Sequence, residues 1–225
     1  MLRSRLATWR FERALGALRS VDIEAIQAYA AASWPAPNTP ADQAPYLALD
    51  FELDGLTRGA HLLQAGWLSY TGDRVALKDA VSLDIRSYAE LNAEAVTIHG
   101  IGEQRAAQGE PVSQVLLQLT AALGGRIMVA HCAEIEQTAL QHAIRKMFNC
   151  HLPIRMICTL TLERRIQPNL MGQDAYRLAA CRERYGLPDY PAHDALTDAI
   201  SAAELLQAQI SRLPPGVTLE QLEYG

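Results

Sequence analysis

The chain has 225 residues, of which 49% are apolar. This is enough to bury one substantial core, so we expect a single domain with appendages. The formal net charge of −5 and the pI near 5.7 argue against a protein that coats duplex DNA through a broad basic surface, because many phosphate contacts demand excess Lys and Arg. This charge and pI do not exclude an enzyme that binds one strand end through a few local contacts.

The cysteine pattern and the hydropathy bear on the compartment. The 4 cysteines form no CxxC pair and no zinc-ribbon spacing, so reduced thiols in a cytoplasm are the simplest interpretation. No apolar run approaches the roughly 18 to 20 residues that are needed to span a bilayer. We therefore expect a cytoplasmic protein without a membrane partner.

The first 45 residues divide into a helical part and a proline-rich part. Residues 1–32 combine apolar residues at helical spacing with several arginines, which predicts a basic helical extension that is docked on the body or solvated. Contact with nucleic acid or a partner, or an organellar targeting role, are the alternatives. Residues 33–45 hold four prolines and are expected to form an extended linker. The main domain is then 46–212, followed by a C-terminal tail, 213–225.

The main domain is predicted to be an α/β domain. Strand-like segments are expected at 45–52, 61–70, 74–80, 126–131 and 154–158, and helices at 111–123, 134–147, 174–185 and 194–211. Three strands are followed by helices that alternate with two more strands. This order favours a sheet with helices on both faces.

The first strand-like segment ends in two acidic residues. Strand alternation in 46–52 places Asp50 and Glu52 on the same face, near the C-terminal end of the strand. Adjacent like charges raise each other's pKa unless a cation neutralises them, which indicates a hard divalent metal such as Mg²⁺. On its own, an Asp-x-Glu pair is weakly specific.

A second acidic candidate lies where an apolar strand turns into a helix. Glu136 shares its helix face with alanines and a leucine, whereas Glu134 shares its face with polar residues. Glu136 is therefore predicted to point inward, where a carboxylate needs a metal or another partner to offset desolvation. The alternative is a buried acid that an arginine or backbone donor satisfies. His131 is interpreted as a satisfied turn histidine.

The third candidate segment is the start of the last long helix. Asp194 is a plausible N-cap, and Asp198 then falls in the opening turns on an apolar face. His193 stands just before this helix at a loop edge, where an imidazole can accept a proton from a water molecule. A surface histidine without a role is the alternative.

Together these segments resemble the DEDDh branch of the DnaQ-like 3′–5′ exonucleases. The family's first motif is matched by DFELDGL at 50–56, the second by HCAEIE at 131–136, and the third by His193 followed by Asp198. The segment IHGI at 98–101 supports the alignment. The resemblance runs from about Pro45 to Gln209, which is most of the chain.

The resemblance implies a fold, cofactors and a partner. The expected fold is ribonuclease H-like with three layers: a central mixed five-stranded sheet, helices on both faces, and the N-terminal helical extension outside it. Asp50, Glu52, Glu136 and Asp198 would hold two Mg²⁺ or Mn²⁺ ions roughly 4 Å apart. His193 would be the general base. The partner would be the 3′ end of single-stranded DNA or RNA, and a polymerase or other protein partner stays open.

The second motif departs from the family pattern. Glu136 replaces an aspartate, Cys132 an asparagine and Ile135 a phenylalanine. The extra methylene of Glu136 can displace an ion, and an ångström-scale error costs on the order of a hundredfold in rate. A degenerate, non-catalytic nucleic-acid-binding module that retains the metal cleft is therefore the alternative. A large gain in activity in Glu136→Asp would favour it.

Overall fold

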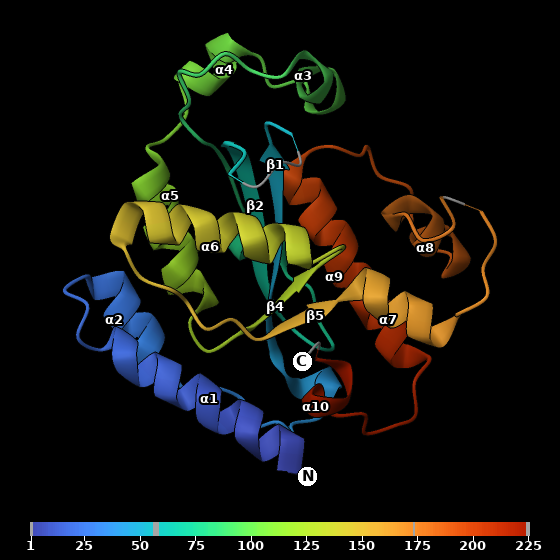
Figure 1. The fold of residues 1–225 in the computed structure, drawn as a ribbon. Helices are drawn as coiled ribbons and strands as arrows, with labels where there is room; N and C mark the ends of the chain where they lie inside the picture. Colours follow the sequence, from blue (N-terminus) through green and yellow to red (C-terminus); the bar gives the residue numbers. More distant parts are fainter. Residues whose placement is uncertain (1, 56–58, 173, 224–225) are drawn as a thin grey trace.

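A computed structural model describes residues 2–55, 59–172 and 174–223 (Figure 1). At its centre lies a five-stranded sheet in the order β3-β2-β1-β4-β5. β1 pairs antiparallel with β2 and parallel with β4, so the sheet is mixed. The strands are β1 Pro45–Leu53, β2 Leu62–Thr71, β3 Val81–Asp84, β4 Ile127–Ala130 and β5 Met156–Cys158.

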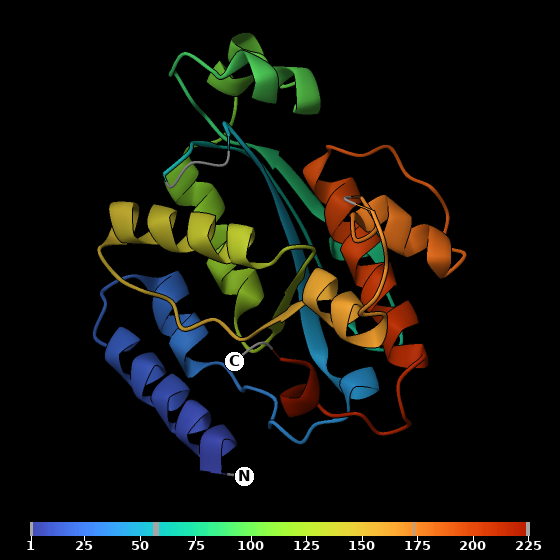
Figure 2. The same cartoon turned by 45° about the vertical axis from the view of Figure 1, so that its right-hand side comes forward.

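Helices cover both faces of this sheet, as Figures 1 and 2 show. α1, α2, α5 and α6 lie on one side, and α7, α8 and α9 lie on the other. α3 and α4 stand beyond the ends of β1 and β2. This arrangement confirms the predicted three-layer fold. The helices are α1 Leu2–Leu18, α2 Glu24–Ala31, α3 Ala93–His99, α4 Glu103–Ala107, α5 Val112–Leu123, α6 Glu134–Phe148, α7 Thr159–Ile166, α8 Leu178–Arg184, α9 Ala195–Ser211 and α10 Leu219–Leu222.

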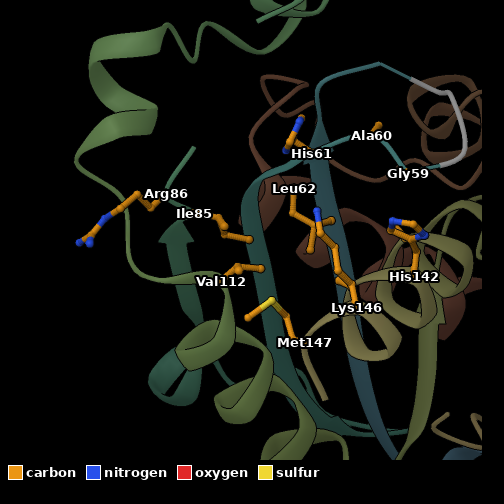
Figure 3. A pocket seen from close by; sticks show the side chains of 12 residues that line it. Gly59, Ala60, His61, Leu62, Ile85, Arg86, Val112, His142, Lys146 and Met147 are labelled. Carbon is orange, nitrogen blue, oxygen red and sulfur yellow. The ribbon is translucent and has the colours of Figure 1, made fainter. Parts of the chain in front are cut away.

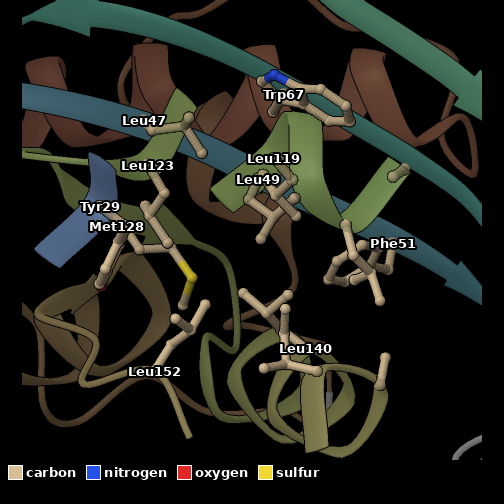
Figure 4. Packing of buried hydrophobic residues seen from close by; sticks show 14 of the residues in the cluster. Tyr29, Leu47, Leu49, Phe51, Trp67, Leu119, Leu123, Met128, Leu140 and Leu152 are labelled. Atoms are coloured by element: carbon tan, nitrogen blue, oxygen red, sulfur yellow. The ribbon is translucent and has the colours of Figure 1, made fainter. Parts of the chain in front are cut away.

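The alternation of β1 divides the core into two parts. Leu47, Leu49 and Phe51 pack with α5 and α6 in the larger apolar cluster, which Figure 4 shows. Tyr46 and Ala48 face the second cluster, beneath α9. Because side chains alternate along a strand, the two residues that continue the α9 side are Asp50 and Glu52. The sheet therefore carries its acidic pair on the face that α9 covers.

The N-terminal helices contribute to the main core. Leu15 and Leu18 of α1 and Ile26 and Tyr29 of α2 are buried in the larger cluster. The proline-rich segment that follows is attached to the body, since the Pro35 carbonyl accepts a hydrogen bond from Arg155. The predicted division of the chain into parts that end at residues 32, 45 and 212 stays a prediction. Met1, Tyr224 and Gly225 lie outside the described residues.

One predicted strand is wrong and several short helices were not predicted. Residues 74–80 contain a turn and a short 3-10 helix, Leu77–Asp79, and the third strand begins only at Val81. The reason is the turn after β2, where Arg74 and Thr71 bond to each other through their backbones. α3, α4, α7 and α10 span four to eight residues each, too few for a clear helical period. Within the described residues, no helix is long and apolar enough to cross a membrane.

Candidate metal-dependent active site

Three carboxylates meet at the C-terminal end of β1. Asp50 and Glu52 come from β1, and Asp198 comes from the first turn of α9. One oxygen from each of the three lies within 4.8 Å of the others. Asp194 caps α9 by accepting a hydrogen bond from the Thr197 backbone N–H at 3.0 Å, as the sequence predicted. The cap fixes where α9 begins and so holds Asp198 toward the strand.

A glycine lets α9 approach this closely. Gly66 of β2 stands opposite Asp50 in the sheet. A Cβ atom on Gly66 would overlap the backbone of Ala195 and Leu196, the first two residues of α9. The absent side chain therefore makes room for the start of the helix directly beside Asp50. This role was not predicted from the sequence.

A hydrogen-bonded chain of side chains fixes the same helix start. Gln64 accepts a hydrogen bond from the Ala195 N–H at 3.0 Å and donates through Nε2 to Asp84 at 3.1 Å. Asp84 can only accept, so it orients the Gln64 amide with its oxygen toward α9. Arg105 of α4 donates two hydrogen bonds of 2.7 Å to the Asp84 carboxylate. The start of α9 is thus tied to α4 through β2 and β3.

We expect Gly66→Ala to destabilise the protein by about 2–3 kcal/mol or more, because a backbone segment cannot rotate away from the new methyl group. Urea denaturation followed by circular dichroism measures the free energy of unfolding. Gly16→Ala is the matched control: a methyl group on this α1 glycine would meet nothing within 4 Å, and Ala there should stabilise by about 0.5–1 kcal/mol. Equal stability of the two variants would contradict the packing role of Gly66.

Glu136 is buried beside the three carboxylates but outside their close group. Its side chain is only 4% exposed, as the helix-face pattern predicted. Its Oε2 atom is buried without a hydrogen-bond partner among the described residues. Among its acidic neighbours, Glu136 makes the largest contribution to the raised pKa of Asp50, ahead of Asp198 and Glu52. A buried carboxylate oxygen without a donor indicates a cation as its partner.

Burial and mutual repulsion raise the pKa of each of these acids. The pKa of Asp50 lies well above its ordinary value, first because of burial and then because of its acidic neighbours. Burial, with repulsion from Asp198 and Asp194, raises the pKa of Glu52 to about 7. Burial, with repulsion from Glu52, raises the pKa of Glu136 to about 8. Burial also raises the pKa of Asp198. Oxygen ligands under such repulsion fit a hard divalent cation.

His193 lies at the edge of this acidic site. Its backbone N–H donates a hydrogen bond of 2.9 Å to Asp198 Oδ2, and its side chain is exposed. The residue has a φ of 67°, a left-handed conformation that few non-glycine residues adopt. The imidazole is close enough to lower the pKa of Asp198, against the effect of burial. The loop therefore presents a histidine from the residue next to the helix cap.

The other residues of the second motif have structural partners. His131 is bonded on both ring nitrogens, to Thr159 Oγ1 and to the Tyr176 carbonyl, each at 2.9 Å, and burial lowers its pKa to about 4. Its interpretation as a satisfied turn histidine is confirmed. Cys132 adopts a left-handed φ of 69°, a conformation that asparagine tolerates best among non-glycine residues. The backbone at residue 132 is therefore one that suits asparagine, the residue of the family's motif, better than cysteine.

α3 and α4 lie beyond the same end of the sheet as the acidic site (Figure 1). Asp54, two residues after Glu52, accepts a hydrogen bond of 2.6 Å from the Asn92 N–H at the start of α3. His99, at the end of α3, is buried, and burial is the main reason that its pKa is lowered; His193 also lies within electrostatic reach. The segment at 98–101 therefore borders the site. Leu56, the last residue of the first motif, lies outside the described residues.

The sequence model of the Exonuclease family matches residues 47–206. The chain belongs to the exonuclease family. This match confirms the resemblance to the DnaQ-like exonucleases, and membership of the family implies use of a divalent metal, for which the acidic cluster is present. No curated protein sequence matches the chain.

Solved exonuclease structures share the fold. Exonuclease X in complex with 5′ overhanging duplex DNA has a TM-score of 0.62 and 24% identity over 79% of this chain and 96% of its own. Cell-death related nuclease 4 has a TM-score of 0.63 and 19% identity over 77% and 65%. E. coli exonuclease I in complex with a dA16 oligonucleotide has a TM-score of 0.66 and 16% identity over 76% of this chain and 42% of its own. At these identities the likeness shows the fold alone.

We expect the metal-free exonuclease to lose stability as the pH rises between about 5 and 8. The pKa values of Glu52 and Glu136 rise from 4.5 to about 7 and 8, so in this window the folded state holds protons that the unfolded state has released. Each such group costs about 1.4 kcal/mol per pH unit, or roughly 3–5 °C in Tm. Thermal melts in EDTA across this range measure the slope. Added Mg²⁺ or Mn²⁺ should remove most of it, and a flat Tm in EDTA would contradict the acidic cluster as the source.

Proposed function

We propose that this chain is a 3′–5′ exonuclease that hydrolyses phosphodiester bonds at the 3′ end of DNA or RNA and releases nucleoside 5′-monophosphates. The observation that carries the proposal is the group of three carboxylates within 4.8 Å of one another, in a chain of the exonuclease family. The buried and unpaired Oε2 of Glu136 beside this group supports it. Such a concentration of acid is costly for a protein that binds no cation there.

We assign Asp50, Glu52, Glu136 and Asp198 as ligands of two Mg²⁺ or Mn²⁺ ions. When bound, two such ions stabilise negative charge on the attacking and leaving oxygens of a phosphoryl displacement. The protein's own contribution is to hold four carboxylates from three elements in one place. Gly66 and Gln64 position the start of α9 for this purpose, and the Asp194 cap holds the turn that carries Asp198.

His193 is the proposed general base. An exposed imidazole at the rim of the carboxylate group can accept a proton from an attacking water molecule and pass it to solvent. The hydrogen bond from the His193 N–H to Asp198 sets the distance of the loop from the site. The leaving 3′ oxygen of the penultimate nucleotide takes up a proton from solvent, and the terminal nucleotide departs with its 5′-phosphate.

The proposed substrate is defined by its free strand end and not by its base sequence. Exonuclease X was solved with 5′ overhanging duplex DNA and E. coli exonuclease I with a dA16 oligonucleotide, which supports a nucleic-acid strand as the partner here. An enzyme that removes every terminal nucleotide reads backbone and stacking, which all bases share. We therefore propose single-stranded 3′ ends of either sugar as the substrate.

The proposed function predicts shortening of a labelled strand from one end. Single-stranded DNA and RNA of 20 nucleotides, labelled at the 5′ end, are incubated with the protein and Mg²⁺, Mn²⁺ or EDTA. A metal-dependent ladder that shortens one nucleotide at a time, with 5′-monophosphates as the released product, is the expected result. The same strands labelled at the 3′ end should lose their label in the first step. Immediate loss of the 5′ label as a mononucleotide would overturn the proposed polarity.

One observation favours a second candidate, a non-catalytic nucleic-acid-binding module. Glu136, which replaces the family's aspartate, lies outside the group of three carboxylates that approach within 4.8 Å of one another. A metal ligand that lies too far away can leave strand binding intact while hydrolysis is lost. Strand binding with metal but no shortening of any labelled strand would support this module.

A further inference from the structure

A small hollow lies between the start of β2 and the adjacent face of α6 (Figure 3). It encloses about 100 Å³ and has an apolar floor to which Leu62, Ile85 and Val112 contribute. Its basic lining residues are His61, which directly precedes β2, Arg86, which follows β3, and His142 and Lys146 of α6. No aspartate or glutamate lines it among the described residues.

Four basic residues line this hollow, and three of them have unpaired side chains within the described part of the chain. The fourth, Arg86, donates a hydrogen bond of 2.9 Å from Nε to the Gly109 carbonyl, and Figure 3 shows its side chain pointing away from the other three. His61, His142 and Lys146 make no side-chain ion pair or hydrogen bond there, whereas Arg155 and Arg182 are each paired with a glutamate. His142 and Lys146 are one helical turn apart and so share a face. Figure 3 shows the Lys146 side chain extending toward Leu62, between His61 and His142. In a chain of net charge −5, this cluster is a local site of opposite sign.

The hollow lies near the end of β1 that carries the acids. The Asp54 N–H, two residues after Glu52, donates a hydrogen bond of 2.9 Å to the His61 carbonyl. α6 carries Glu136 in its first turn and the two basic residues six and ten positions later, about 9 and 15 Å along the helix axis. That span is about three to four nucleotides at roughly 3.4 Å per nucleotide of a helical strand, and fewer for an extended one.

We propose that this hollow binds a backbone phosphate of the nucleic-acid strand whose 3′ end occupies the carboxylate site. The inference rests on the proposed function. Lys146 supplies a permanent positive charge, and each imidazole offers at least one N–H donor in either protonation state. Because the phosphate is common to all nucleotides, the contact is independent of sequence. The contact favours strands that are long enough to reach from the carboxylate site to Lys146.

The test is binding of a 5′-fluorescein-labelled 12-nucleotide single-stranded DNA to the full chain in EDTA, where no metal-dependent cleavage occurs. Lys146→Gln should weaken binding roughly three- to tenfold, as expected for one charge-assisted contact. The slope of log affinity against log salt should fall by about 0.7, the value for one phosphate of a single strand. His61→Gln with His142→Gln should weaken binding further.

Arg145→Gln is the matched control, because it removes the same charge from the same helix. Arg145 is exposed and does not line the hollow. This variant should change the affinity less than about twofold and leave the salt slope nearly unchanged. Equal weakening in Lys146→Gln and Arg145→Gln, or weakening in neither, would overturn the proposal.

A small substrate separates this proposal from the proposed function. The p-nitrophenyl ester of thymidine 5′-monophosphate fills only the carboxylate site, so wild type and Lys146→Gln should hydrolyse it equally with Mn²⁺. A matching loss of ester hydrolysis in Lys146→Gln would mean a structural defect and overturn the phosphate site. If the wild type fails to hydrolyse the ester, the proposed function has failed. The binding experiment still shows whether the hollow binds a backbone phosphate.

Discussion

Asp50→Asn should lower the nuclease activity by about 10³-fold or more and at the same time stabilise the metal-free protein at pH 8. Burial is the largest cause of the raised pKa of Asp50, and repulsion from four acidic neighbours raises it further. Asparagine has the same shape but no charge. The substitution therefore removes a metal ligand and also relieves the repulsion that opposes folding without metal.

The two opposite effects make Asp50→Asn informative. Initial rates of strand shortening with Mn²⁺ measure the loss, and thermal melts in EDTA measure the gain. Asp79→Asn is a suitable control because this aspartate pairs with Lys78 in a solvent-exposed ion pair. It should match wild type in both measurements. Loss of activity together with a lower Tm in EDTA would point to misfolding, and retained activity would exclude Asp50 as a metal ligand.

Local patterns in the sequence were enough to place the acids on their elements. Strand alternation put Asp50 and Glu52 on one face of β1, and the helix-face pattern turned Glu136 inward, where the structure buries it. The capping pattern at Asp194 placed Asp198 in the first turn of α9. Each of these features depends on residues fewer than ten positions apart. The roles of these acids in catalysis stay predictions.

Long-range contacts explain what the sequence did not reveal. Gln64 bonds to Ala195, 131 positions away, and Gly66 matters only because the start of α9 lies against it. Glutamine at residue 64 carries no local signal. A glycine inside a strand indicates a bulge or a close backbone approach, but it does not say which segment approaches. The unpaired basic side chains on α6 likewise gain meaning only once β2 lies beside them. Glu136 was correctly predicted to be buried. Its position outside the close group of three carboxylates depends on how α6 packs against β1, which no local pattern in the sequence reveals.

His193→Asn should lower kcat by roughly 10²–10⁴-fold with little change in strand or metal binding. Asparagine is the informative replacement because His193 adopts a left-handed φ of 67°, which asparagine tolerates better than alanine. The backbone hydrogen bond from residue 193 to Asp198 is then retained, and only the imidazole is lost. The expected loss is therefore a loss of proton transfer, with the carboxylates still in place.

The pH profile tests this assignment most directly. A histidine base is inactive when it is protonated, so wild-type kcat should fall on the acid side and His193→Asn should lose that dependence. His151→Asn, at an exposed histidine of the segment between α6 and β5, is the control and should behave as wild type. A His193→Asn enzyme that keeps both its rate and its acid limb would remove the residue from the mechanism. The proton would then be taken by solvent.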